Sequence, residues 1–148
     1  MKKNSLLTLS GVYHIKERLY SRLLRRRGLD NLSPAQGRIL MALWEQDDIP
    51  VRQLAELTSL DKSTLSLSLS RMEQNGIVQR AGDPTDRRIV RVKLTEHGKT
   101  YRSVCEETMR DMEEILYRGM DASDVEVFQR VLDQMLLNLT EQESTLGI

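Results

Sequence analysis

The stretch "DKSTLSLSLSRMEQNG", Asp61 to Gly76, favours one structure in its middle and another at its ends. The middle, "LSLSLS", alternates apolar and polar residues, which is the period of a half-buried strand. The ends favour a helix, because Asp61 can cap an N-terminus and Gly76 after Asn75 can close a C-terminus. The flanking "DKST" and "RMEQNG" are also poor strand material. We therefore predict a helix over residues 61–74.

The two faces of this predicted helix differ in character. Leu65, Leu69 and Met72 follow at i, i+4 and i+7, the spacing of a face that packs into a core, with Ser68 at its edge. The other face is polar except for one leucine, so it is either a solvated surface or a surface offered to a partner. That face and its margins carry Lys62, Ser63, Thr64, Ser66, Leu67, Ser70 and Arg71.

The segments before this helix predict two more helices. "LSPAQGRILMALWEQ" has an N-cap at Ser33 and Pro34 at the first helical position, where a missing N–H is harmless. "DDIP" ends that helix. "VRQLAELTSL" then predicts a short helix with Leu54, Ala55 and Leu57 facing the core. Two short helices joined by a tight turn are the layout of a helix-turn-helix.

The segment after Gly76 predicts a β-hairpin. In "IVQRAGDPTDRRIVRVKL" two apolar runs flank the turn residues "AGDPTD". The tip of the hairpin is basic, through Arg87 and Arg88. The apolar side of its second strand carries Ile89 or Val90, then Val92 and Leu94. Helix, turn, helix and hairpin in this order predict a winged helix.

The two ends of the chain predict long amphipathic helices. The first runs from about Leu9 to Arg27 and ends in "RRRG", which is either a solvated helix end or a contact with phosphates or a partner. The later pair runs from Thr95 to Arg118 and from Asp121 onward. Such helices suggest pairing between two copies of the chain, and the alternative is packing on their own domain. Their apolar stripes comprise Val12, Ile15, Leu19 and Leu23; Tyr101, Val104, Cys105, Thr108, Met112, Ile115 and Leu116; and Val125, Phe128, Val131, Leu132, Met135, Leu136 and Leu139.

Composition excludes several classes of protein. The 148 residues suit one domain with an extension, and the single cysteine, Cys105, excludes an intrachain disulfide framework. A cytoplasmic location fits, since no run approaches the ~20 apolar residues that span a bilayer. Two histidines, His14 and His97, are too few for a metal site unless carboxylates complete it, so we expect no metal and no other cofactor. No phosphate loop, nucleophile elbow or two-histidine motif indicates an enzyme, so we expect no catalytic residues.

The net charge of the chain is zero, but the charge is unevenly distributed. Residues 1–30 carry +6, residues 31–100 carry +1 and residues 101–148 carry −7. The overall charge therefore gives no reason to expect a nucleic-acid partner, whereas the local distribution still can.

Four pieces of the chain together resemble the MarR family of dimeric winged-helix transcriptional regulators. They are "LSPAQGRILMAL", "VRQLAELTSLDKSTLSLSLSRMEQNGIVQR", "DPTDRRIVRVKLTEHGK" and the terminal pair of helices, and they cover nearly the whole chain. The third piece is the most specific, since it matches the family's wing pattern at Asp86, Arg88, Leu94 and Thr95. The sequence departs from the family at Leu67, where a basic or otherwise polar residue is frequent.

The resemblance implies a mainly α fold with a small β-hairpin wing. Residues 31–95 would form the winged helix-turn-helix domain, and residues 1–30 and 96–148 a helical dimerisation region. Residues 61–74 would be the recognition helix in the major groove of DNA, and residues 79–93 the wing at the minor groove.

Physical chemistry agrees with these assignments. Hydroxyl and cationic side chains can bind phosphates and base edges, Leu67 can touch a thymine methyl, and arginines suit a narrow minor groove. Asp86 would orient an arginine, because it would itself repel phosphate. The candidate DNA-binding residues are Lys62, Ser63, Thr64, Ser66, Leu67, Ser70, Arg71, Arg87 and Arg88.

These features predict a homodimeric, sequence-specific DNA-binding regulator of the repressor type. Two copies would place their recognition helices about one DNA turn apart, ~34–36 Å, on a pseudo-palindromic operator. The alternative is a winged-helix protein-interaction module that binds no operator, which the neutral net charge and the serine-rich helix keep open. Substituting alanine for Arg87 and Arg88 would separate the two.

The resemblance also raises the question of an effector, because many members respond to small aromatic ligands and others sense oxidants through an N-terminal cysteine. Tyr13, His14, Met41 and Trp44 could line a pocket, but core packing explains Met41 and Trp44 equally well, so no effector is assigned. Cys105 lies on an apolar stripe, where a buried thiol is inert, so we expect no thiol switch.

Overall fold

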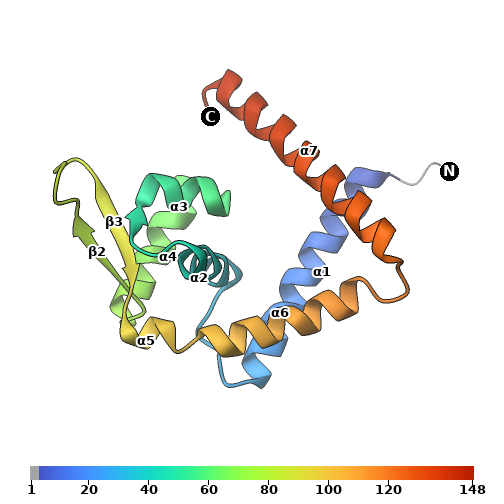
Figure 1. Cartoon of the computed structure of the whole chain (residues 1–148), viewed down its shortest axis with the longest axis horizontal. Helices are drawn as coiled ribbons and strands as arrows, with labels where there is room; N and C mark the ends of the chain where they lie inside the picture. The colour runs from blue at the N-terminus through green and yellow to red at the C-terminus, as the bar shows by residue number, and fades with distance from the viewer. Residues whose placement is uncertain (1–3) are drawn as a thin grey trace. The chain divides into compact units, whose positions relative to one another are not determined.

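The structure, a computed structural model, describes residues 4–148 and is mainly helical with one small antiparallel sheet. This confirms the predicted winged-helix fold (Figure 1). The chain divides into two compact units, Met1–Met112 and Glu113–Ile148. The elements are α1 (Ser5–Arg26), α2 (Pro34–Glu45), β1 (Ile49–Pro50), α3 (Val51–Thr58), α4 (Lys62–Gln74), β2 (Val78–Gly82), β3 (Val90–Leu94), α5 (Glu96–Lys99), α6 (Arg102–Leu116) and α7 (Ala122–Leu146).

Helix α4 resolves the conflict in "LSLSLS" in favour of the helix. The Asp61 carboxylate accepts a hydrogen bond from the Thr64 N–H at 3.0 Å, which caps the first turn. Gly76 follows the helix with φ +69°, a left-handed conformation that favours glycine. As predicted, Leu65, Leu69 and Met72 are buried on one face, together with Ser68. Caps and flanks over the whole segment outweigh the six-residue alternation.

Helices α3 and α4 both pack against α2 to form the core of the first unit. A capping box begins α2, because the Gln36 N–H donates to Ser33 Oγ and the Ser33 N–H donates to Gln36 Oε1. The core side chains from α2 and α3 include Ile39, Leu40, Leu43 and Leu54, all fully buried.

One prediction about α3 is wrong. Leu57 was expected to face the core, but it is 51% exposed, and Thr58 is buried in its place. Thr58 lies four residues after Leu54 and therefore on the same narrow face of this short helix. Its hydroxyl donates to the Leu54 carbonyl at 2.7 Å, which satisfies the buried polar group.

The sheet contains one strand that the sequence did not reveal. Strand β1 pairs with β3, with Ile49 opposite Val92, although "DDIP" was interpreted only as a helix break. Two residues are too few to show alternation, and Pro50 is tolerated because β1 lies at the edge of the sheet order β1-β3-β2. The β2–β3 hairpin has the register Val78 opposite Leu94 through Gly82 opposite Val90.

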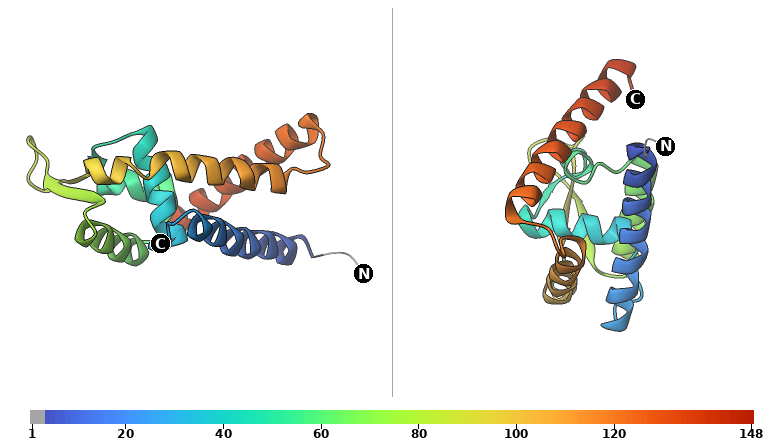
Figure 2. Two further views of the ribbon diagram at one scale, coloured as in Figure 1. Left: turned by 90° about the horizontal axis from the view of Figure 1, so that it is seen from below. Right: turned by 90° about the vertical axis from the view of Figure 1, so that its right-hand side faces the viewer.

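The hairpin is the wing. Val92 and Leu94 are buried as predicted, whereas Val90, on the same side of the strand, is 45% exposed. The reason is visible in Figure 1 and in the left view of Figure 2, where the hairpin extends beyond the helices that cover its base. Alternation therefore gives the face of each residue correctly but not the depth of the core beneath it.

The helix predicted from Thr95 to Arg118 is interrupted. Thr95 does cap a helix, because its Oγ1 accepts the Gly98 N–H at 3.0 Å, but α5 ends at Lys99. The first turn of α5 packs tightly against Ile77, the residue just before β2. A Cβ on Gly98 would lie 2.1 Å from the Ile77 carbonyl oxygen, so only glycine fits there. Of the predicted stripe, Tyr101, Cys105, Thr108 and Met112 are buried, whereas Ile115 is 39% exposed.

Helix α1 begins at Ser5, earlier than predicted, with Asn4 as its cap. Its predicted stripe is not the buried face, because Val12 and Ile15 are exposed, whereas Tyr20 and Leu24 are buried. Both buried residues of α1 thus lie in its C-terminal half.

The arginine cluster at the end of α1 serves partly to anchor the helix. Arg27 donates to the buried Thr108 hydroxyl at 3.1 Å and to Asp111 at 2.6 Å, both on α6. Arg25 and Arg26 remain exposed.

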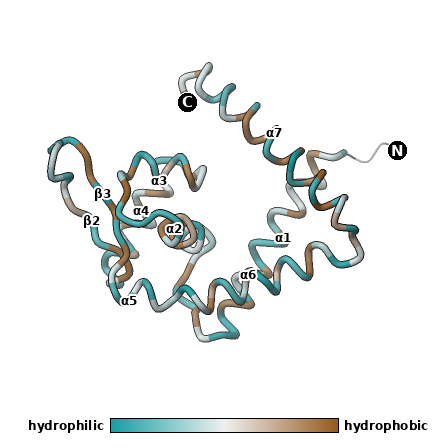
Figure 3. Tube along the Cα trace, in the orientation of Figure 1, coloured by the Kyte–Doolittle hydropathy of each residue, from teal (hydrophilic) through white to brown (hydrophobic). Residues whose placement is uncertain are grey.

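The second unit consists of the end of α6 and helix α7. The apolar stripe of α7 is present, and hydrophobic residues recur along the helix in Figure 3, yet none of its residues is buried. Within the unit, the rings of Tyr117 and Phe128 meet edge to face at 6.5 Å. None of the helices in residues 4–148 is long and apolar enough to cross a membrane.

Candidate nucleic-acid interface

The outer face of α4 presents most of the side chains that the sequence predicted to contact DNA. Lys62, Ser63, Ser66, Leu67 and Arg71 are exposed, and Leu67 leaves 54% of its surface in solvent. The Asp61 carboxylate already caps the N-terminal end of α4, so the exposed Lys62 is the group there that can attract a phosphate.

Thr64 and Ser70 are less available than the rest, because both are half-buried and already bonded. The Thr64 hydroxyl donates to Asp61, and this bond lowers the pKa of the Asp61 carboxyl. The Ser70 hydroxyl accepts a bond from the Arg80 guanidinium at 3.4 Å. Each hydroxyl therefore holds its neighbour in place and keeps only part of its bonding capacity for a ligand.

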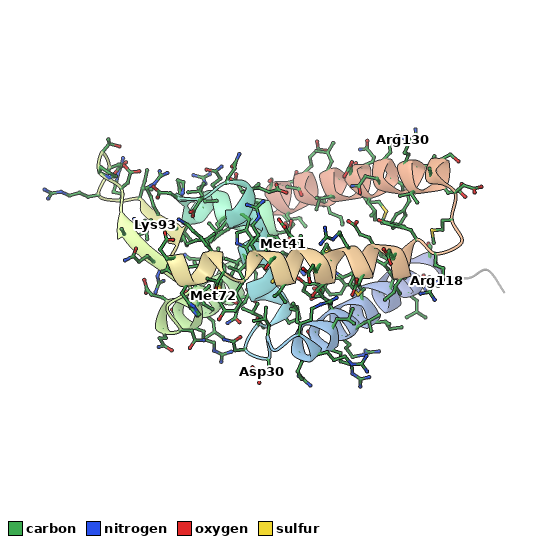
Figure 4. All side chains as sticks on the ribbon, turned by 60° about the horizontal axis from the view of Figure 1, so that its bottom comes forward. Asp30, Met41, Met72, Lys93, Arg118 and Arg130 are labelled. Carbon is green, nitrogen blue, oxygen red and sulfur yellow. The ribbon has the colours of Figure 1, made fainter. Side chains whose placement is uncertain are left out.

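The tip of the wing carries two exposed arginines. Arg88 forms a two-point contact with Asp86, from Nε at 3.1 Å and Nη2 at 2.9 Å, while 90% of its side chain remains exposed. The same hydrogen bonds lower the pKa of Asp86. Asp86 thus lies where it can orient Arg88, and Arg87 beside it is exposed. In Figure 4 a long side chain with nitrogen atoms at its end projects from this end of the hairpin.

The base of the wing is tied down by residues that the sequence did not identify as a group. Arg91 on β3 donates to Asp83 in the turn at 3.1 Å and to Asp48 before β1 at 3.1 Å. Asp83 also accepts the hydroxyl and N–H of Thr85, and these bonds lower its pKa to about 2. The only signal in the sequence was the turn motif "DPT", because Asp48 joins the group through the unpredicted strand pairing.

A second missed contact links the wing to α4. Arg80 on β2 donates from Nη2 to Glu73 on α4 at 3.0 Å, and its backbone N–H donates to the same carboxylate at 3.0 Å. Nothing in the spacing of these two residues marks them as partners, because the turn at Gly76 separates them.

The surface between α3 and the wing is concave and basic. Arg80 and Arg88 line it from the hairpin and Arg52 lines it from α3, with Pro50, Val51, Gln53, Glu56, Ile89 and Val90 completing the lining. A phosphate backbone is the polyanion that fits such a surface in a winged helix.

A second hollow lies between α1, α2 and the start of α4. Tyr13 and His14 line it as the sequence suggested, whereas Met41 and Trp44 do not. Arg38 also lines it, and its guanidinium donates to the Tyr13 hydroxyl at 3.0 Å. An aromatic ring and a cation side by side suit an aromatic acid.

The buried Cys105 lies away from both surfaces, on the packed face of α6. Burial raises the pKa of its thiol to about 11, which leaves little reactive thiolate near neutral pH. Within residues 4–148, no group of three or more histidine, cysteine or acidic side chains is arranged to hold a metal ion.

Comparison with known proteins gives a family for the part of the chain that forms this interface. Residues 32–90 match the family model described as MarR family. The organic hydroperoxide resistance transcriptional regulator of Bacillus subtilis (strain 168) is 38% identical over 68 residues, which are 46% of this chain and 46% of that protein. The chain thus matches about half the length of this relative.

Solved structures show the same fold over nearly the whole chain. The crystal structure of the transcriptional regulator SlyA covers 95% of this chain and 96% of its own, with 19% identity and a TM-score of 0.85. The Bordetella bronchiseptica protein BpsR covers 90% and 93%, with 20% identity and a TM-score of 0.80. The BpsR structure concerns the mechanism by which 6-hydroxynicotinic acid regulates DNA binding by that protein.

Proposed function

From the match of residues 32–90 to the MarR family model, we propose that the chain is a MarR-type, homodimeric, sequence-specific DNA-binding transcriptional regulator of the repressor type, acting in the cytoplasm. The observation that carries the proposal is the exposed polar face of α4 beside a basic wing, on a helix whose apolar face is fully used by its own core.

In this proposal α4 lies in the major groove and the wing lies at the minor groove. Ser63, Ser66 and Arg71 offer hydrogen bonds to base edges and phosphates, and Leu67 offers an apolar contact to a thymine methyl. Arg87 and Arg88 fit the negative potential of a narrow minor groove. The serine-rich face supplies few charges, so we expect the wing to provide much of the salt-dependent part of the affinity.

The dimer is proposed to form through residues 1–30 and 96–148, with residues 31–95 left to bind DNA. The support is the apolar surface that each unit leaves uncovered: Val12 and Ile15 on α1, and Phe128, Val131, Leu136 and Leu139 on α7. A two-fold dimer places two α4 helices about one DNA turn apart, ~34–36 Å, on a pseudo-palindrome.

We also propose that the hollow beside Tyr13, His14 and Arg38 takes a small aromatic acid as effector. Its lining includes Asp61 and Thr64, so a bound ligand would touch the N-cap of α4 directly. Titration of 6-hydroxynicotinic acid and salicylate, with the Arg38→Ala variant as control, tests this. Saturable binding that is lost in the variant supports it, and equal binding to both proteins would contradict it.

The regulator proposal is tested by mobility shift of the purified chain on DNA flanking its own gene, at two salt concentrations and with a scrambled competitor. We expect competitor-resistant binding that weakens with salt, and that weakens further when Arg87 and Arg88 are both replaced by alanine. Binding no better than to the scrambled duplex, on this fragment and on a randomised library, would instead favour the interaction-module function.

A further inference from the structure

The recognition helix and the wing are joined by one carboxylate. Three donors of Arg80 converge on Glu73: the backbone N–H on Oε2 at 3.0 Å, Nε on Oε1 at 3.3 Å and Nη2 on Oε1 at 3.0 Å. Nη2 also donates to Ser70 Oγ at 3.4 Å. Arg80 is therefore bonded to two residues of α4 on consecutive turns, and it is held through both its side chain and its backbone.

The position of Arg80 in the sheet makes this contact more than a surface ion pair. Strand β2 is an edge strand, because the sheet order is β1-β3-β2. An edge strand leaves N–H groups without a neighbouring strand, and Glu73 satisfies one of them. The pair is partly open to solvent, with 31% of the Arg80 side chain and 39% of the Glu73 side chain exposed, so its strength lies in the number of bonds that converge on one carboxylate. The hydrogen bonds from Arg80 lower the pKa of Glu73, which keeps the carboxylate ionised.

We propose that Glu73 is a positioning residue for DNA binding, which acts by fixing Arg80 and thereby the orientation of the wing relative to α4. This inference rests on the proposed function. Arg80 lines the basic concave surface beside Arg52 and Arg88, where a simple charge count would make it a phosphate ligand. The geometry assigns its guanidinium instead to α4. The contact between Arg80 and Glu73 then sets the distance between α4 in the major groove and the wing at the minor groove.

The proposal predicts a change of affinity with a sign opposite to that expected from electrostatics. Glu73→Gln removes a negative charge near the DNA-facing surface, so charge alone would strengthen binding. The amide replaces one acceptor oxygen with a donor, so at least one of the three bonds from Arg80 is lost. A misplaced wing should then weaken binding to the operator roughly fivefold.

Glu56→Gln is the matched control. Glu56 lines the same concave surface and pairs with Arg52 at 3.9 Å, but its side chain is 71% exposed and the pair does not bridge the wing to α4. This variant makes the same change of charge on the concave surface without touching the contact between the wing and α4, so it should bind DNA slightly more tightly. Weaker binding by Glu73→Gln alone supports positioning, and tighter binding by both variants would overturn it.

Arg80→Lys tests the other side of the contact. It distinguishes a role of Arg80 in positioning the wing from a role as a positive charge that binds phosphate. Lysine keeps the positive charge but lacks the planar fork that donates two bonds to one carboxylate. If Arg80 fixes the wing, the lysine variant loses affinity while the slope of affinity against salt changes little. If Arg80 were a phosphate ligand, lysine would retain the affinity, and the proposal would fail.

Amide hydrogen exchange of the free protein tests the contact without DNA. Glu73→Gln should speed exchange at Arg80 and along β2, whereas Glu56→Gln should leave these amides unchanged. Unchanged exchange in Glu73→Gln would contradict the proposal. If the wild type binds no operator, the proposed function fails, while the exchange result still decides whether Glu73 orders the wing.

Discussion

Helices α4 and α7 are both amphipathic, but they use their apolar faces differently. In α4 the stripe of Leu65, Leu69 and Met72 is buried by neighbouring helices of its own unit, and the polar face is left outside. In α7 a longer and more regular stripe has no buried residue. Periodicity therefore predicts that a helix has an apolar face, whereas only the structure shows whether the chain itself covers that face.

The largest expected effect comes from removing a core side chain of α4. Leu69 is fully buried, so Leu69→Ala should lower the free energy of unfolding by about 2–5 kcal/mol through lost burial and the cavity left behind. Urea unfolding followed by circular dichroism measures it. A loss below about 1 kcal/mol would mean that this face of α4 is packed less tightly than described.

A truncation on α7 should act mainly on assembly, with a smaller cost to folding from the lost ring contact between Phe128 and Tyr117. Phe128→Ala removes a ring that is 42% exposed in the single chain, so we expect at least about 2 kcal/mol lost from dimer association, as for a central interface residue. Sedimentation equilibrium gives the dissociation constant. Glu126→Ala, on the opposite side of α7, is the control, and an equal dissociation constant for both variants would place the interface elsewhere.

The outer face of α4 offers the sharpest contrast with its inner face. Leu67 is two residues before Leu69, yet Leu67→Ala should change the free energy of unfolding by less than about 0.5 kcal/mol. The same substitution should weaken operator binding by about 1 kcal/mol through loss of an apolar contact with the bases. Calorimetric binding and urea unfolding on one preparation separate the two effects. Destabilisation as large as for Leu69→Ala would contradict the assignment of faces.

The smallest effect concerns the polar contacts that order the wing. The pKa of Asp83 is lowered to about 2 from an ordinary 3.8, first by the Thr85 hydroxyl and then by backbone N–H groups and Arg91. A lowered pKa means that the stabilisation is present above pH 3.8 and disappears as the pH falls through about 2. The difference in stability between wild type and Asp83→Asn should therefore be constant from pH 7 to about pH 5 and shrink below that. A difference that stays constant down to pH 2 would show that Asp83 does not act through its charge.

Much of the winged helix could be predicted from the sequence because its signals are local. Caps such as Asp61, Ser33 and Thr95 depend only on nearby residues, and the turn around Asp83 has its own chemistry. Strand β1 could not be predicted, because its existence depends on pairing with residues far along the chain. The burial of Thr58 in place of Leu57 depended in the same way on which face of α3 meets its neighbours.

The residues of the candidate interface also fall into two groups, those predictable from local sequence and those that depend on the fold. The exposed residues of α4 and the arginines of the wing follow from local pattern and from family resemblance. The residues that orient them do not, since Glu73 meets Arg80, and Arg91 meets Asp48, only after the hairpin has folded onto its neighbours. The separation of two such residues along the sequence does not predict their contact, because the fold alone determines which side chains meet.

The most direct test of the central claim is selection of bound duplexes from a randomised DNA library by the purified wild-type chain. We expect enrichment of a pseudo-palindrome whose half-sites are centred about 10–10.5 base pairs apart, or a multiple of that, and loss of enrichment when Arg87 and Arg88 are replaced by alanine. A library that remains unenriched after repeated rounds would contradict the claim that the exposed face of α4 and the wing recognise an operator.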